Sequence, residues 1–83
     1  MEYTRLNKGV CSRSTKVVLE DGIIKEVKII GGCDGNIKGI SQLVVGMSAE
    51  EAIKRIKGIR CGLKSTSCPD QLALALEEAL ANN

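Results

Sequence analysis

The sequence predicts an α+β fold, in which an N-terminal antiparallel β-hairpin or small sheet is followed by two to three helices packed on one face. Three observations predict it. β-branched residues fill the first half, the turn dipeptide Asp21-Gly22 divides them, and a helix-capping pattern opens the second half. With 83 residues, the chain is long enough for one small domain over residues 1–83 and too short for two.

The first half of the chain is expected to form two strands, over residues 15–20 and 23–30. The Asp21-Gly22 pair between them is a strong hairpin signal, so the strands are expected to be adjacent and antiparallel. Apolar and polar residues alternate imperfectly in both strands, so the sequence leaves their register open. A further short strand over residues 2–6 is weakly indicated.

The second half is expected to form helices. Ser48-Ala49-Glu50-Glu51 is a capping box, and apolar residues at helical spacing follow it until the chain reaches Gly58. Pro69 suits the first position of a last helix that extends to Ala81. A weaker helix is expected over residues 36–45, with Asn36 as its cap. The apolar stripe of the last helix comprises Leu72, Ala73, Leu76, Ala79 and Leu80.

The opposite face of the last helix is expected to carry Gln71 and Glu78, together with Leu74 and Ala75. Apolar residues among polar ones leave two interpretations open. An ordinary exposed leucine is favoured, because such residues are common on protein surfaces, and a surface for self-association or a partner is the alternative. A homodimer would also help to stabilise a domain of this size.

The composition excludes several functional classes. The chain has no histidine, which excludes Ser-His-Asp hydrolysis, Cys-His proteases and histidine-ligated zinc. Tyr3 is its one aromatic residue and its net charge is +2, so neither base stacking nor nucleic-acid binding is indicated. No apolar run reaches the roughly 18 residues of a membrane span, and the N-terminus carries no export signal. The expected location is therefore the cytoplasm, with no membrane partner.

Four cysteines, Cys11, Cys33, Cys61 and Cys68, are the candidates for chemistry. In a reducing cytoplasm they are interpreted as metal ligands, redox groups or buried apolar residues, whereas a secreted protein would leave three disulfide connectivities open. Each lies at the edge of a predicted element, and all but Cys68 have a glycine within two positions. Four thiolates aimed at one centre would make a closed, structural zinc site.

The cysteine spacing argues against that site, because no Cys-x-x-Cys pair is present and the closest pair, Cys61 and Cys68, is separated by six residues. A redox alternative centres on Cys68. If Pro69 begins the helix, Cys68 is its cap, where the positive end of the helix dipole favours a thiolate. In a plainer alternative, Cys68 occupies the cap position without a chemical role, and Ser67 or Thr66 makes the hydrogen bond to the first turn of the helix.

Other motifs are weaker. The glycine-rich turn Gly31-Gly32-Cys33-Asp34-Gly35 lacks both the G-x-G-x-x-G pattern and the Walker lysine, so a connecting turn is favoured over nucleotide binding. Asp21 is explained by its turn and Asp70 by the first turn of a helix, so neither requires a catalytic role.

The segment Thr66-Ser67-Cys68-Pro69-Asp70 resembles the signature of the TSCPD domain family, which takes its name from these five residues. The resemblance covers nearly the whole chain, so residues 1–83 are interpreted as a single TSCPD-like domain. Three further blocks, which contain the other cysteines, carry the resemblance: Gly9-Val10-Cys11-Ser12, Gly31-Gly32-Cys33-Asp34-Gly35-Asn36 and Ile59-Arg60-Cys61-Gly62.

The resemblance implies a relation to the C-terminal domain of adenosylcobalamin-dependent ribonucleotide reductases, the oxidoreductases of DNA synthesis. Small free-standing members of the family also exist. The chain has no room for the catalytic barrel or the cobalamin site, so it is not expected to be a complete ribonucleoside-diphosphate reductase, and no residue is assigned a catalytic role. The family's cysteines imply a metal site formed by Cys11, Cys33, Cys61 and Cys68, with zinc as the expected ion.

Two functions follow from the resemblance. The first is an accessory or interaction module, held together by a four-cysteine zinc site, that binds a ribonucleotide reductase subunit, another protein or a nucleic acid. The alternative is a thiol-redox partner that delivers electrons to a reductase through Cys68 and Cys61. A structural protein with four buried thiols is a third possibility.

Overall fold

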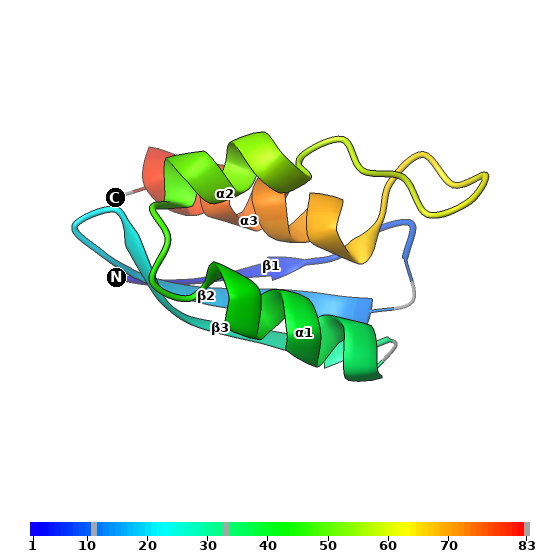
Figure 1. The fold of residues 1–83 in the computed structure, drawn as a ribbon, viewed down its shortest axis with the longest axis horizontal. Helices are drawn as coiled ribbons and strands as arrows, with labels where there is room; N and C mark the ends of the chain where they lie inside the picture. Colours follow the sequence, from blue (N-terminus) through cyan, green and yellow to red (C-terminus); the bar gives the residue numbers. More distant parts are fainter. Residues whose placement is uncertain (11, 33, 83) are drawn as a thin grey trace.

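The computed structural model describes residues 1–10, 12–32 and 34–82, and confirms the predicted α+β fold (Figure 1). Its three strands form one antiparallel sheet in the order β1-β2-β3. Three helices follow the strands along the chain. The elements are β1 (Glu2–Leu6), β2 (Ser12–Glu20), β3 (Ile23–Gly31), α1 (Asp34–Val44), α2 (Ala49–Ile56) and α3 (Cys68–Ala81).

The predicted hairpin is formed by β2 and β3. Asp21 and Gly22 both take positive φ angles, 54° and 77°, which these residue types tolerate and which a two-residue hairpin turn requires. The weakly indicated first strand is also confirmed, since β1 pairs antiparallel with β2. The pairing of β2 with β3 shifts register twice, between Ser12 and Ser14 and between Val18 and Leu19. The sequence carries no local signal for these irregularities.

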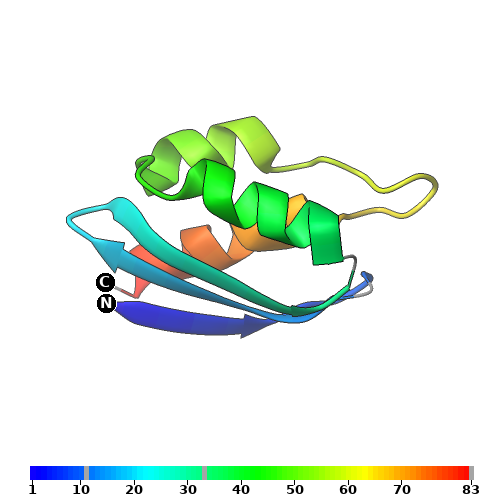
Figure 2. The same cartoon turned by 60° about the horizontal axis from the view of Figure 1, so that its bottom comes forward.

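The helices lie on one side of the sheet (Figure 2). α3 packs against β1 and β2, α1 packs against β3, and α2 packs against α3. The opposite face of the sheet carries charged side chains, where Lys16 lies 3.5 Å from Glu2 and 3.7 Å from Glu26. Within the described residues, no helix is long and apolar enough to cross a membrane.

α3 is buried on two sides, because the sheet contacts one side and α2 the other. The predicted apolar stripe is confirmed. The predicted polar face is wrong, since Gln71 is 3% exposed and Ala75 is fully buried. Ala75 is therefore unable to form a self-association surface. The core comprises Val17, Leu19, Ile24, Val44, Ala49, Ala52, Ile56, Leu72, Ala73, Ala75, Leu76 and Ala79.

The start of α2 follows its sequence signal closely. The Ser48 hydroxyl accepts a hydrogen bond from the Glu51 amide at 3.1 Å, as the capping box predicts. α1 begins at Asp34, two residues before the predicted cap Asn36, and continues through Gly39. The loop between α2 and α3, which carries Cys61, lies at the end of the molecule opposite the chain ends (Figure 1).

Candidate functional site

The five-residue signature builds the start of α3. Ser67 is the N-cap: its Oγ accepts the Asp70 amide at 3.2 Å and donates to the Ile59 carbonyl at 2.6 Å. Pro69 lies in the first turn of α3. The backbone N–H groups of a first turn have no partner within the helix, so a proline there costs no helical hydrogen bond. α3 begins at Cys68, so the prediction that Cys68 is the cap is wrong, and the alternative in which Ser67 bonds the first turn is confirmed.

Asp70 fastens the preceding loop to the helix. Its Oδ1 accepts the Gly58 amide at 2.7 Å and its Oδ2 accepts the Thr66 hydroxyl. Burial by itself raises the pKa of this carboxyl. The hydrogen bonds from Thr66 and Gly58, with the charges of Lys57 and Arg5, outweigh burial and hold the pKa below its ordinary value. The ionised Asp70 therefore has a structural role.

Gln71 connects the signature to the first strand. Its Oε1 accepts hydrogen bonds from the Arg5 guanidinium and, at 3.0 Å, from the Lys8 amide. Its Nε2 donates to the Thr66 hydroxyl oxygen at 3.0 Å. These three hydrogen bonds are made by a side chain that is 3% exposed. Gln71 is buried because the segments around it supply its partners.

Glu78 extends this link along β1. It accepts the Tyr3 hydroxyl at 2.7 Å and the Arg5 Nε at 2.6 Å. The hydrogen bond from Tyr3 lowers the pKa of Glu78, whereas burial raises it. The hydrogen bond from Arg5 and the charges of Arg5 and Lys8 also lower this pKa, so it stays below its ordinary value. The hydrogen bond between Tyr3 and Glu78 raises the pKa of Tyr3. These side chains hold α3 on the sheet.

We expect acid to weaken this link. A carboxyl whose pKa is lower in the folded chain contributes stability that is present above its unfolded pKa and is lost as the pH falls through its folded pKa. For Glu78 the loss begins below about pH 4.3. Urea unfolding of the wild type and the Glu78→Gln variant should therefore show a difference in stability at pH 6 that shrinks towards pH 3. A pH-independent difference would contradict this account.

Cys68 lies against the start of β2. Its Sγ is 3.2 Å from the Oγ of Ser12, which is itself buried. Asn7 donates to the same Ser12 oxygen at 2.8 Å and accepts the Thr15 hydroxyl at 2.9 Å. This polar cluster fixes the position of β2 relative to the first residue of α3, and Cys68 is left half-buried.

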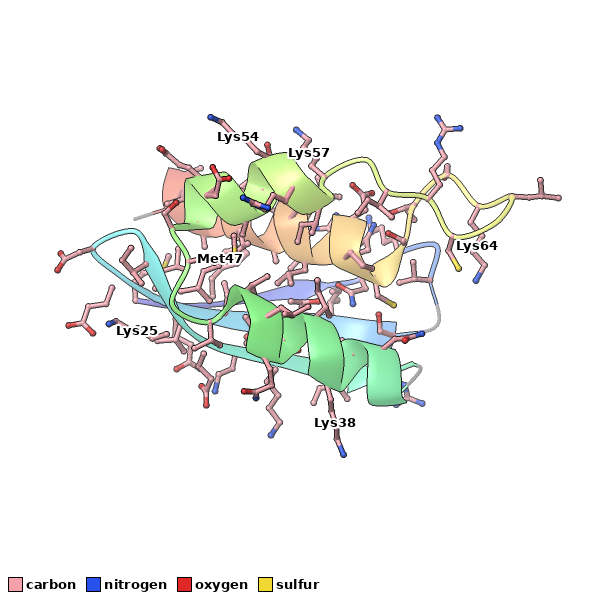
Figure 3. The ribbon with its side chains drawn as sticks, viewed as in Figure 1. Lys25, Lys38, Met47, Lys54, Lys57 and Lys64 are labelled. Carbon is pink, nitrogen blue, oxygen red and sulfur yellow. The ribbon has the colours of Figure 1, made fainter. Side chains whose placement is uncertain are left out.

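Cys61 and Cys68 line one cleft between α1 and the start of α3, with a volume of about 490 Å³. Cys61 opens a tight turn in the loop between α2 and α3, because its carbonyl accepts the Lys64 amide at 3.0 Å and its amide donates to the Thr66 carbonyl at 3.1 Å. Figure 3 shows Lys64 on this loop. The α1 side of the cleft includes Ile37 and Ile40.

Cys11 lies outside the described residues, but both of its flanks reach the signature. Ser12, the next residue, contacts Cys68. Gly9, two residues earlier, has a φ of 74°, and a Cβ atom there would lie 3.0 Å from the Thr66 methyl group. The connection between β1 and β2 therefore passes directly beside the start of α3.

Cys33 also lies outside the described residues, and its flanks lead to the same region. Gly31, two residues earlier, pairs with Ser12 across the sheet. α1 begins immediately after Cys33, and its first turns, at Gly35 and Asn36, line the cleft that contains Cys61 and Cys68. The structure thus places Cys61 and Cys68 on one cleft, Ser12 in contact with Cys68, and residues shortly after Cys33 on the wall of the same cleft.

The surroundings of the cleft favour negative charge. The first turns of α1 and α3 both line it, so the positive ends of two helix dipoles lie at its walls. Arg60 directly precedes Cys61 and Lys64 follows it by three positions, and residues 52–69 include no acidic side chain, although the ionised Asp70 follows in the first turn of α3. Among the described residues, no three His, Cys, Asp or Glu side chains form a metal-binding group.

Several residues that support the cleft were not predicted from the sequence. Ser12 had a signal, because it follows Cys11 directly and lies in one of the cysteine blocks. Arg5 had none, since its partners Gln71 and Glu78 are 66 and 73 residues away along the chain. Helical periodicity predicts an exposed position for Gln71, because the pattern does not show that both the sheet and α2 pack against α3.

Comparison with known proteins agrees with the signature. The family model of the TSCPD domain matches residues 1–80, which include all four cysteines and every block that carries the resemblance. No curated protein and no solved structure matches the chain. With a match over nearly its whole length, the chain belongs to the TSCPD domain family.

Proposed function

We propose that the chain is a small accessory or interaction module in which Cys11, Cys33, Cys61 and Cys68 bind one zinc ion. The observation that carries the proposal is the cleft lined by both Cys61 and Cys68. Residues next to the other two cysteines in the chain lie at or near this cleft, since Ser12 contacts Cys68 and pairs with Gly31 across the sheet. A zinc ion held by four thiolates is closed to water and supplies structural cross-linking rather than Lewis-acid chemistry.

The electrostatics of the cleft support a thiolate site. Zinc with four thiolates carries a net charge of about −2, which needs compensation from the surrounding protein. The starts of α1 and α3, together with Arg60 and Lys64, provide positive potential around the cleft. The small size of the chain is a further argument, since the hydrophobic core of so short a domain is marginal and a cross-link or metal helps to stabilise it.

Family membership supports a partner for this module. The family includes the C-terminal domain of adenosylcobalamin-dependent ribonucleotide reductases, so a reductase subunit or another protein in the reducing cytoplasm is the proposed partner. The proposal assigns no cobalamin site and no complete reductase activity to this chain. The side chains of the signature instead position Cys68: Ser67 caps α3, and Asp70 holds the loop.

A redox function is the second candidate, because Cys61 and Cys68 line the same cleft and Cys61 is exposed. In this function the two thiols are oxidised to one disulfide, and two electrons and two protons pass to an oxidised disulfide in a reductase. The metal and redox functions use the same cleft and differ in the number of cysteines that they require.

The test is a zinc competition titration of the wild type and the four single Cys→Ser variants against a chromophoric chelator, under anaerobic reducing conditions. We expect each variant to lose more than about 100-fold in zinc affinity, beyond the loss typical of an outer-shell residue. Ser65→Ala, in the same loop, is the matched control and should bind zinc normally. Zinc binding that is insensitive to Cys11→Ser or Cys33→Ser would overturn the four-cysteine site.

A further inference from the structure

A second surface runs along α1, where two hollows adjoin. The cleft with the cysteines lies between α1 and the start of α3, and another, of about 560 Å³, lies between α1 and α2. Ile40 and Leu43 line both hollows. Leu43 is 74% exposed and Val45, just after α1, is 42% exposed. Figure 3 shows Met47, which lines the second hollow, between α1 and α2.

This arrangement is more than a single exposed leucine. An apolar ridge beside a hollow has the shape of a contact surface, because a partner side chain can enter the hollow between α1 and α2 while Leu43 is covered. Lys54 and Lys57 project from α2 away from α1, so they leave this surface free (Figure 3). Self-association, which the sequence offered on the last helix only as the less favoured alternative, is therefore better located on α1.

Carboxylates gather at one end of this surface. Asp21, in the β2–β3 turn, and Glu50, in the first turn of α2, line one small hollow. Glu51 lies in the second cleft and pairs with Arg55 at 3.0 Å. Glu50 forms no salt bridge with the residues that the structure describes. Lys25 lies near this end as well and offsets part of its negative charge (Figure 3).

Cations gather at the other end. Arg60 and Lys64 belong to the loop that carries Cys61 into the first cleft, and neither forms a salt bridge within the described part of the chain. Leu63, between them, is fully exposed. The molecule is 35 Å long and 20 Å wide, and Figure 1 shows this loop and the β2–β3 turn at its opposite ends. The surface along α1 thus joins an acidic end to a basic end.

We propose that two copies of this chain associate through the α1 surface, antiparallel about a two-fold axis. In this arrangement the basic loop of each copy faces the acidic end of the other, and the two Leu43 ridges meet near the axis. A parallel arrangement would place like charges together and is disfavoured. A second copy is the occupant that the structure favours, because one chain carries both halves of the charge complementarity. The apolar part of this contact uses no cysteine, because Leu43 and the hollow between α1 and α2 form it.

The first test is the oligomeric state by sedimentation equilibrium, in reducing buffer, from micromolar to millimolar protein. We expect a reversible dimer that weakens with added salt. Leu43→Glu should weaken dimerisation by more than about 10-fold, as expected for a buried interface anchor. Leu6→Glu is the matched control: Leu6 is 72% exposed but lies on β1, so this variant should dimerise normally. A chain that stays monomeric, or a dimer that is insensitive to Leu43→Glu, overturns the proposal.

The second test is a charge exchange that fixes the orientation. Glu50→Lys alone and Lys64→Glu alone should each weaken the dimer, and the double variant should restore it, because position 50 of one copy faces position 64 of the other. A double variant no tighter than either single one overturns the antiparallel arrangement. Zinc content is measured on the same samples. A monomeric chain that retains zinc would overturn only the dimer proposal. A dimer that contains no zinc would overturn only the metal-site proposal.

Discussion

Replacing Asp70 with alanine is expected to lower the free energy of unfolding by roughly 2–4 kcal/mol. The carboxylate is 9% exposed and accepts hydrogen bonds from the Gly58 amide and the Thr66 hydroxyl. Its removal leaves both donors without that acceptor in a region that water reaches poorly, and each such loss costs on the order of 1–3 kcal/mol. Because the same bonds hold the loop before α3, the environment of Cys61 should change as well.

Urea denaturation followed by circular dichroism measures this loss. Glu77→Ala is the matched control in the same helix, since Glu77 forms only a surface salt bridge to Lys57 at 2.8 Å. That variant should lose no more than about 1 kcal/mol. Equal losses in the two variants would show that Asp70 is an ordinary surface carboxylate. Thiol accessibility at Cys61, measured on folded Asp70→Ala protein, should increase relative to the wild type.

Removal of zinc is expected to unfold the chain or open its cysteine-bearing end, if the proposed function is correct. Structural zinc supplies on the order of 10 kcal/mol of apparent binding free energy in small domains, which is comparable with the 5–15 kcal/mol total stability of typical proteins. Thermal unfolding in reducing buffer, with and without a strong chelator, measures the effect. We expect a large fall in Tm on chelation and its recovery when zinc is added back.

The control for chelation is the Cys68→Ser variant, which keeps the size and a polar group at that position but lacks one ligand. Its Tm should be low from the start and should respond little to the chelator, because the site is already incomplete. A wild-type Tm that is unchanged by chelation would contradict a structural metal. Amide hydrogen exchange would then be expected to show the same protection of β2 and α1 with and without zinc.

Elements with local signals were predictable from the sequence. The Asp21-Gly22 turn and the Ser48 capping box each act over a few residues, so the hairpin and α2 were placed correctly. The register shifts in β2 and β3 and the second buried side of α3 depend on packing between distant segments. Periodicity alone assigned Gln71 to solvent for this reason.

The candidate site was predicted in part. The sequence named Cys61 and Cys68 as the closest pair and as the redox alternative, but the spacing, without a Cys-x-x-Cys pair, did not show that they share a cleft. The structure brings them to one cleft because the loop turns tightly at Cys61 and because Ser67 and Asp70 fasten that loop to α3. The contact between Ser12 and Cys68 spans 56 residues. Such a contact depends on how β2 meets α3, which no local pattern encodes.

The central claim is tested most directly by elemental mass spectrometry of protein purified without chelator, with thiols counted in the native and the denatured states. The account predicts about one zinc per chain and four thiols that react only after chelation and denaturation. Protein without metal, in which Cys61 or Cys68 is alkylated in the native state, would contradict the four-cysteine site and favour electron transfer through these two residues.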